Sequence, residues 1–214
     1  MRVVMFMLLC ILMMSACQHT EKKLPYLGEP TVTKHFRDGH TVYDSAYPVI
    51  PAFSLTDQDS LTVTPKTFNG KIYVADFIFL SCPTICPTMN DNMLQLYHHF
   101  KNENRVNFLS HSIDPKHDTI PRLKAYANSL HITDDKWRFV TGDQDTIFHL
   151  AEKGYYAAVA KDSADATNYI HSGGFFLIDT QRHIRGVYNG TDKEAMQHLI
   201  NDIQILLKED SQKR

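Results

Sequence analysis

The most constraining feature of this sequence is the pattern of a buried strand that ends at two closely spaced cysteines. Residues 71–80 (KIYVADFIFL) form a nearly continuous apolar run, which is typical of a central strand covered on both faces. Cys82 and Cys86 follow at once, separated by three residues and each followed by proline. The sequence therefore predicts two thiols at one end of a buried strand.

The residues after the cysteines predict a helix that begins near Cys86. Apolar side chains recur at spacings of three and four residues, as on the buried face of a helix. They are Met89, Met93, Leu96, Tyr97 and Phe100. Pro87 suits the first helical turn, where its missing N–H costs nothing. Because a helix N-terminus favours thiolate over thiol, the pattern indicates a metal-binding or redox-active pair.

A purely structural disulfide is the alternative for Cys82 and Cys86. Such a bond would close too small a loop to restrain the unfolded chain much. We therefore favour metal binding or redox cycling for this pair.

The first sixteen residues have the pattern of a signal peptide. Arg2 precedes an apolar stretch over residues 3–14, which is shorter than the roughly 20 residues of a membrane span. Ser15, Ala16 and Cys17 resemble the lipobox of bacterial lipoproteins, whose cysteine is lipidated. We expect a membrane-anchored lipoprotein of the bacterial cell envelope, with its domain outside the cytoplasm. An ordinary cleaved signal or an uncleaved anchor is the alternative.

The rest of the chain divides into a tether and one folded domain. Residues 17–44 are polar and contain two prolines, as suits a segment that holds a domain away from a membrane. Residues 45–214 have the length of a single domain. Without residues 1–16 the formal charge is −3, which argues against binding to nucleic acid. Cys82 and Cys86 are then the one thiol pair of the domain.

Strand and helix patterns alternate along the domain after this pair. Strands are expected at 106–113, 137–140, 174–179 and 184–188, and helices at 119–130, 146–154 and 192–207. This order predicts an α/β three-layer sandwich, with a central mixed sheet flanked by helices. A dithiol at the end of the first central strand makes the predicted fold thioredoxin-like.

Three separated segments resemble the Sco (SenC) family of copper-handling, thioredoxin-fold proteins. They are residues 81–87 (SCPTICP), 112–119 (SIDPKHDT) and 169–171 (YIH). The resemblance implies one copper ion per domain, as Cu(I) or Cu(II), bound by Cys82, Cys86 and His171. Two soft thiolates suit Cu(I), and an added imidazole lets the same site accept Cu(II).

The residues around His171 support its role as a ligand. A glycine-rich stretch and an apolar strand follow it, so we expect it at a strand entrance beside the dithiol. Asp114 has two alternative roles, as a cap of the helix that begins near Thr119 or as a hydrogen-bond partner that orients His171. Asp165, in the loop before His171, is another candidate for the orienting contact. The other histidines share no ligand spacing, and His98 and His99 are expected on a solvated helix face.

The resemblance implies a membrane-tethered copper chaperone that delivers copper to, or matures, the copper-A centre of cytochrome c oxidase. Its partner would be the copper-A-bearing subunit or another exported copper protein, and a monomer is the default. Such a protein transfers copper and is not an enzyme.

A thiol-disulfide reductase that keeps the cysteines of an exported metalloprotein reduced is the alternative, and it would use the same two thiols. A thiol peroxidase is disfavoured, because the expected Thr or Ser three residues before the reactive cysteine is replaced by Phe79 or Pro83. A copper sensor would have the same sequence features.

Overall fold

The computed structural model describes residues 22–82, 84–161, 169–171 and 173–213, without the side chains of residues 161, 170, 171 and 213. The predicted signal peptide, Cys17 and Asp165 lie outside the described residues. Within the described part of the chain, no helix is both long and apolar enough to span a bilayer.

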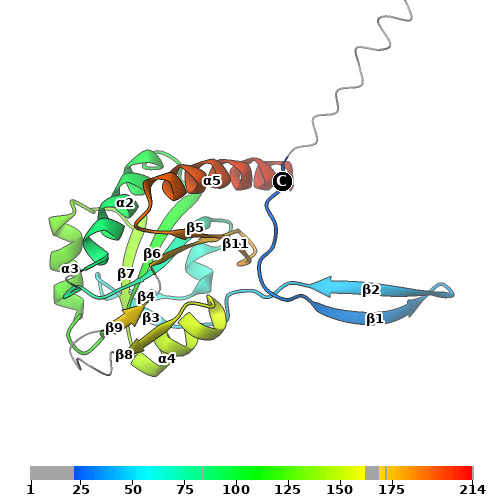
Figure 1. The fold of residues 1–214 in the computed structure, drawn as a ribbon, viewed down its shortest axis with the longest axis horizontal. Coiled ribbons are helices and arrows are strands. Elements are labelled where there is room, and N and C mark those ends of the chain that lie inside the picture. Colours follow the sequence, from blue (N-terminus) through cyan, green and yellow to red (C-terminus); the bar gives the residue numbers. More distant parts are fainter. Residues whose placement is uncertain (1–21, 83, 162–168, 172, 214) are drawn as a thin grey trace, which may run out of the picture.

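A seven-stranded mixed sheet forms the centre of the domain (Figure 1). In spatial order its strands are β11 (Ile184–Asn189), β10 (Gly174–Ile178), β5 (Ile72–Ile78), β6 (Val106–Ser112), β7 (Trp137–Thr141), β3 (Leu55–Asp57) and β4 (Thr62–Val63). The strands β5, β6 and β7 are parallel, and the other pairs are antiparallel. Every residue of the three parallel strands is buried, as expected for strands covered on both faces.

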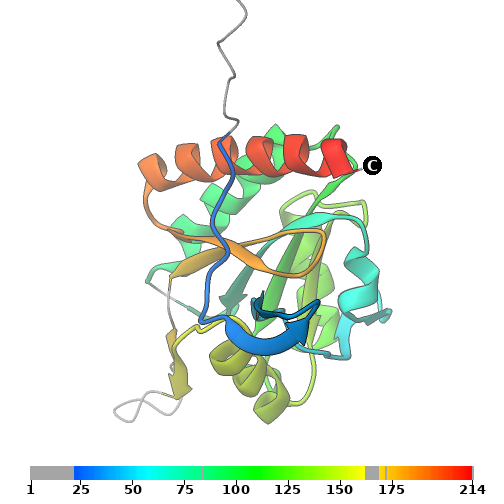
Figure 2. The ribbon, with the colours of Figure 1, turned by 90° about the vertical axis from the view of Figure 1, so that its right-hand side faces the viewer.

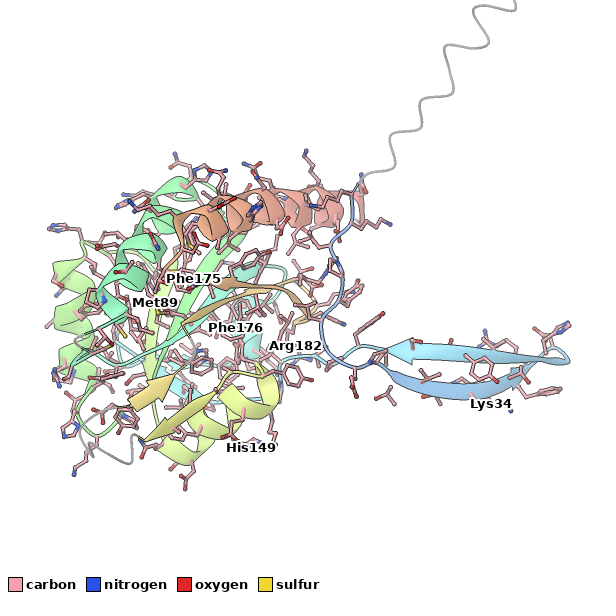
Figure 3. The ribbon with its side chains drawn as sticks, viewed as in Figure 1. Lys34, Met89, His149, Phe175, Phe176 and Arg182 are labelled. Atoms are coloured by element: carbon pink, nitrogen blue, oxygen red, sulfur yellow. The ribbon has the colours of Figure 1, made fainter. Side chains whose placement is uncertain are left out.

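Helices cover both faces of this sheet (Figures 1 and 2). They are α2 (Cys86–His99), α3 (Ile120–Ser129), α4 (Gln144–His149) and α5 (Lys193–Lys213). The helices α2, α3 and α5 share one hydrophobic core, and α4 shares the other with its π-helical continuation Leu150–Gly154. Neighbouring residues of β10 point into different cores: Phe175 packs with Met89 in the first, and Phe176 lies in the second (Figure 3). The predicted three-layer α/β sandwich is confirmed.

Several short elements carry no periodic signal in the sequence. Besides β3 and β4, they are a 3-10 helix (Pro65–Phe68) and the ribbon of β8 (Val159–Lys161) with β9 (Tyr169–His171). Strands of two or three residues are too short for alternation to be recognised. The last helix continues past the predicted end at residue 207 to Lys213.

The segment expected to serve as a tether contains a β-hairpin. Strand β1 (Thr31–Arg37) pairs antiparallel with β2 (His40–Ala46), and the two project away from the domain (Figure 1). The turn consists of Asp38 and Gly39, both with positive φ (51° and 80°). Asp-Gly with two positive φ angles is a preferred two-residue hairpin turn, so this local signal was present in the sequence.

Arg185 fastens the chain before the hairpin to the domain. Its buried guanidinium donates to Asp179 Oδ2 and Glu209 Oε2, each at 3.0 Å. It also donates to the backbone carbonyls of Leu24 (2.6 Å) and Pro25 (3.0 Å). One buried cation thus joins β11, the end of α5 and the N-terminal segment.

Replacing Arg185 with methionine should lower the free energy of unfolding by about 3–5 kcal/mol, because Asp179 stays buried without its cation. Arg105→Met is the matched control, since the Arg105–Glu103 pair is partly exposed and should contribute about 1 kcal/mol or less. Urea unfolding of both variants measures the difference. Equal losses would contradict the role given to Arg185.

Candidate metal centre

The two cysteines lie between the end of β5 and the start of α2, as predicted. Cys86 is the first residue of α2, and Pro87 lies in its first turn. The Cys82 N–H donates to the Phe79 carbonyl at 3.1 Å, which closes a tight turn after the strand. Both side chains are nearly enclosed, with Cys82 9% and Cys86 3% exposed.

The surroundings of the two sulfurs shift the pKa values of the two thiols in opposite directions. Burial would raise the pKa of Cys82, but hydrogen bonds from the Cys86 thiol, the Thr84 and Cys86 backbone and the Thr84 hydroxyl outweigh it, so the pKa is lowered. The Thr84 hydroxyl lies 3.6 Å from the Cys82 sulfur. Burial, the hydrogen bond with Cys82 and the nearby Cys82 and Asp76 charges raise the pKa of Cys86 well above its ordinary value. Cys82 is therefore the more readily ionised thiol. The expectation that the helix start favours a thiolate is wrong for Cys86, because burial and the hydrogen bond with Cys82 raise its pKa.

Asp118 ties the cysteine loop to the end of β6. Its Oδ2 accepts hydrogen bonds from the Leu80 N–H at 3.1 Å and from the Ser112 hydroxyl at 2.7 Å. Thr119 is the N-cap residue of α3, and its side chain makes no capping bond. The expectation that Asp114 caps this helix is wrong, because its carboxylate binds other donors, and Asp118 is likewise engaged.

Asp114 holds the strand that carries His171. Its Oδ1 accepts from the Tyr169 hydroxyl at 3.1 Å, and its Oδ2 pairs with His117 Nδ1 at 2.8 Å. Gln144 Nε2 also donates to the Tyr169 hydroxyl, at 3.2 Å. Asp114 thus positions β9 through Tyr169, two residues before His171.

Residues on both sides of His171 in the sequence lie against the segment that carries the two cysteines. On one side, the Tyr169 ring centroid lies 5.4 Å from that of Phe79. On the other, a Cβ atom added at Gly173 would lie 3.4 Å from Ile85 Cδ1, so the Gly173 backbone lies against the residue before Cys86. The backbone of His171, at the end of β9, is therefore held beside the cysteine loop.

The side chain of His171 lies outside the described part of the structure. Among the side chains that are described, no group of three or more His, Cys, Asp or Glu residues is arranged to hold a metal ion. A third metal ligand beside Cys82 and Cys86 is therefore not found among the described side chains. His98 and His99 are exposed on α2, as expected.

The sequence interpretation missed two buried titratable residues on the strands next to the dithiol. Asp76, on β5, is fully buried, and neither carboxyl oxygen has a hydrogen-bond partner among the described residues. Burial raises its pKa to about 7, against the opposing effect of the Ser110 hydroxyl.

His111, on β6, stacks on Phe77 at 4.8 Å, and its Nδ1 lies 3.2 Å from the Asp76 carbonyl oxygen. Burial lowers its pKa to about 4. The signal for both residues was a polar side chain inside an apolar strand pattern.

Cys82 should react with iodoacetamide faster than Cys86 near neutral pH, because hydrogen bonds stabilise its thiolate. Cys86→Ala should raise the pKa of Cys82 by removing the hydrogen bond from the Cys86 thiol, and Cys82→Ala isolates the reactivity of Cys86. Alkylation rates measured against pH on the reduced protein give both pKa values. Equal rates for the two thiols would contradict the separation.

Asp76→Asn should change how stability depends on pH. The contribution of Asp76 to the stability of the native protein should fall as pH rises from about 4 to about 7, because its carboxyl ionises near 3.8 in the unfolded state and only near 7 in the folded state. The variant lacks this decline and should gain up to about 4 kcal/mol relative to the native protein over that range. Urea unfolding at several pH values tests this, with Asp91→Asn, at an exposed position of α2, as control. A pH-independent difference between native and Asp76→Asn protein would refute the raised pKa.

Known proteins with this fold match most of the chain. The solved structure of a SCO1/SenC family lipoprotein from Bacillus anthracis has a TM-score of 0.68 and 30% identity, covering 74% of this chain and 95% of that one. BsSco is described as a Sco-family cytochrome c oxidase assembly protein with a disulfide switch. Its structure has a TM-score of 0.65 and 32% identity, covering 74% of this chain and 93% of that one. ScoI of Bradyrhizobium japonicum, solved with copper bound, has a TM-score of 0.57 and 26% identity, covering 72% of this chain and 98% of that one.

The family model described as SCO1/SenC matches residues 42–208. This match covers well over half of the sequence and includes both cysteines and the β9 strand. The thioredoxin-like fold expected from the sequence is shared with the solved Sco structures. The chain belongs to the SCO1/SenC family.

Proposed function

We propose that this chain is a copper chaperone that binds one copper ion through Cys82, Cys86 and His171. It delivers copper to, or matures, the copper-A centre of cytochrome c oxidase. The observation that carries this proposal is the bracketing of His171, whose neighbours Tyr169 and Gly173 contact Phe79 and Ile85 on the dithiol segment. The copper-bound B. japonicum ScoI and the oxidase-assembly role stated for BsSco support it.

The donor set fits copper as the cargo of the protein. Two thiolates bind Cu(I) well, and the imidazole extends the site to Cu(II). The lowered pKa of Cys82 makes it the first ligand to engage, whereas Cys86 must release its proton on binding. Copper loading therefore releases protons and weakens in acid. Three protein ligands leave a side open for an acceptor to take the ion by ligand exchange.

A lipid on Cys17 would keep the domain close to the membrane. The Arg185 network fixes the chain at Leu24, and seven fully extended residues span at most about 25 Å. The part of the domain that holds Leu24 would then remain within that distance of the bilayer surface. The B. anthracis relative is itself described as a lipoprotein.

Thiol-disulfide exchange is the second candidate function, favoured by the unequal acidity of the two thiols. The Cys82 thiolate would attack a partner disulfide and form a mixed disulfide, which the Cys86 sulfur would then resolve. The partner leaves with two thiols, the Cys82–Cys86 pair leaves as a disulfide, and an external reductant must restore it. The disulfide switch named for BsSco supports this reading.

Copper titration of the reduced fragment 18–214 tests the proposal. One equivalent of Cu(II) should bind with a sulfur-to-copper charge-transfer band, because two thiolates and an imidazole hold the ion. His171→Ala should abolish this band, weaken Cu(I) binding and leave disulfide exchange largely intact. His98→Ala, at an exposed position of α2, is the matched control and should bind as the native protein does.

Serine at Cys82 or Cys86 should abolish both tight copper binding and exchange, since each reaction needs both sulfurs. Unchanged Cu(II) affinity in His171→Ala would remove His171 from the site. No stoichiometric copper uptake by protein that still reduces a model disulfide would favour the reductase.

A further inference from the structure

One face of the β1–β2 hairpin carries three apolar side chains that the described part of the chain leaves mostly exposed. The register pairs Val32 with Ser45, Lys34 with Tyr43 and Phe36 with Thr41, so these six side chains share one face of the ribbon. Phe36 is 78% exposed, Tyr43 63% and Val32 58%. Figure 3 shows Lys34 on the projecting hairpin, well away from the domain. A lone two-stranded hairpin is marginally stable in water, so packing of this face against another surface would stabilise it.

A cavity of about 600 Å³ opens beside the root of the hairpin. Its walls are mainly apolar, and they come from the segment before β1, the chain after α4 and the strands β10 and β11. The main side chains are those of Leu27, Tyr155, Tyr156, Phe176, Ile184 and Val187, with Glu29 as the acidic member. Tyr156 and Val187 are more than half exposed at its opening. The volume is enough for several side chains.

The hairpin cannot fill the cavity of its own chain in this arrangement. Glu29 lines the cavity, and Phe36 lies seven residues further along an extended strand, roughly 23 Å away. The hairpin of a second copy can reach the cavity. Because each hairpin starts beside its own cavity, two antiparallel hairpins related by a two-fold axis would bring each tip to the other's cavity. Such an exchange closes on itself and gives a dimer.

We propose that two copies of this chain exchange hairpins, so that Phe36 of each enters the cavity of the other. Charge favours this occupant, because Lys34 lies on the apolar face with Phe36, and Glu29 is the acidic residue of the cavity. In the part of the chain that the structure describes, neither Lys34 nor Glu29 makes an ion pair. The exchange gives each of them a partner of opposite charge.

The contact area fits a dimer at the small end of specific interfaces. An aromatic side chain buries about 150–250 Å², and only the exposed parts of Phe36 (78%) and Tyr43 (63%) remain to be covered. The two copies together would therefore bury roughly 400–700 Å² of these side chains. The surfaces that cover them lose a similar area, which brings the total to roughly 800–1,400 Å². The proposed dimer differs from the monomer expected from the sequence, which rested only on a copper site contained in one domain.

Site-specific photocrosslinking in the full-length chain tests the exchange. The photoreactive residue is introduced as Phe36→p-benzoylphenylalanine in cells that express two differently tagged copies. Irradiation should give a product that carries both tags, with the crosslink in a peptide containing Tyr156 or Val187. Leu61→p-benzoylphenylalanine is the control, because Leu61 is also exposed but belongs to neither surface, and it should give no such product.

Charge reversal provides the second measurement. Lys34→Glu and Glu29→Lys should each lower the yield of the doubly tagged product at least fivefold, and the double variant should restore it to within twofold of the starting level. Crosslinks only to another protein or to lipid, no doubly tagged product, or no rescue by the double variant would each overturn the proposal.

Discussion

The parallel pairing of β5 with β6 is the constraint on which the rest of the candidate site depends. Its register sets Ile78 opposite Ser112, and the Ile113 N–H then donates to the Ile78 carbonyl at 2.9 Å. Both strands therefore end at the same edge of the sheet. The loop that carries the cysteines and the loop that carries Asp114 and Asp118 leave this edge side by side. The hydrogen bond from Leu80 to Asp118 joins them.

From this edge, a series of contacts reaches the third proposed ligand. Asp114 holds Tyr169, Tyr169 packs on Phe79, and Gly173 lies against Ile85. Each contact involves a residue close to His171 in the sequence, either Tyr169 before it or Gly173 after it. A ligand set assembled in this way depends on packing and loop hydrogen bonds, because three segments far apart in the sequence must meet at one point.

Two other features lie in different parts of the structure. Beneath the dithiol, Asp76 is buried without hydrogen-bond partners among the described residues, and it helps to raise the pKa of Cys86. At the far end of the sheet, the hairpin exposes an apolar face near an open cavity. Asp76 affects the chemistry of the thiols, and the exposed hairpin face concerns contact with another copy of the chain.

The sequence by itself determined the strand, the turn and the helix around Cys82 and Cys86, since apolar periodicity and proline position act over a few neighbouring residues. It also predicted the layered α/β fold. It could not predict that Asp114 and Asp118 bind loop donors instead of capping α3, nor the neighbours that bury Asp76 and His111. Those features depend on which distant segments meet, and only the tertiary structure decides that, because hydrogen-bond partners and burial are properties of the packed chain.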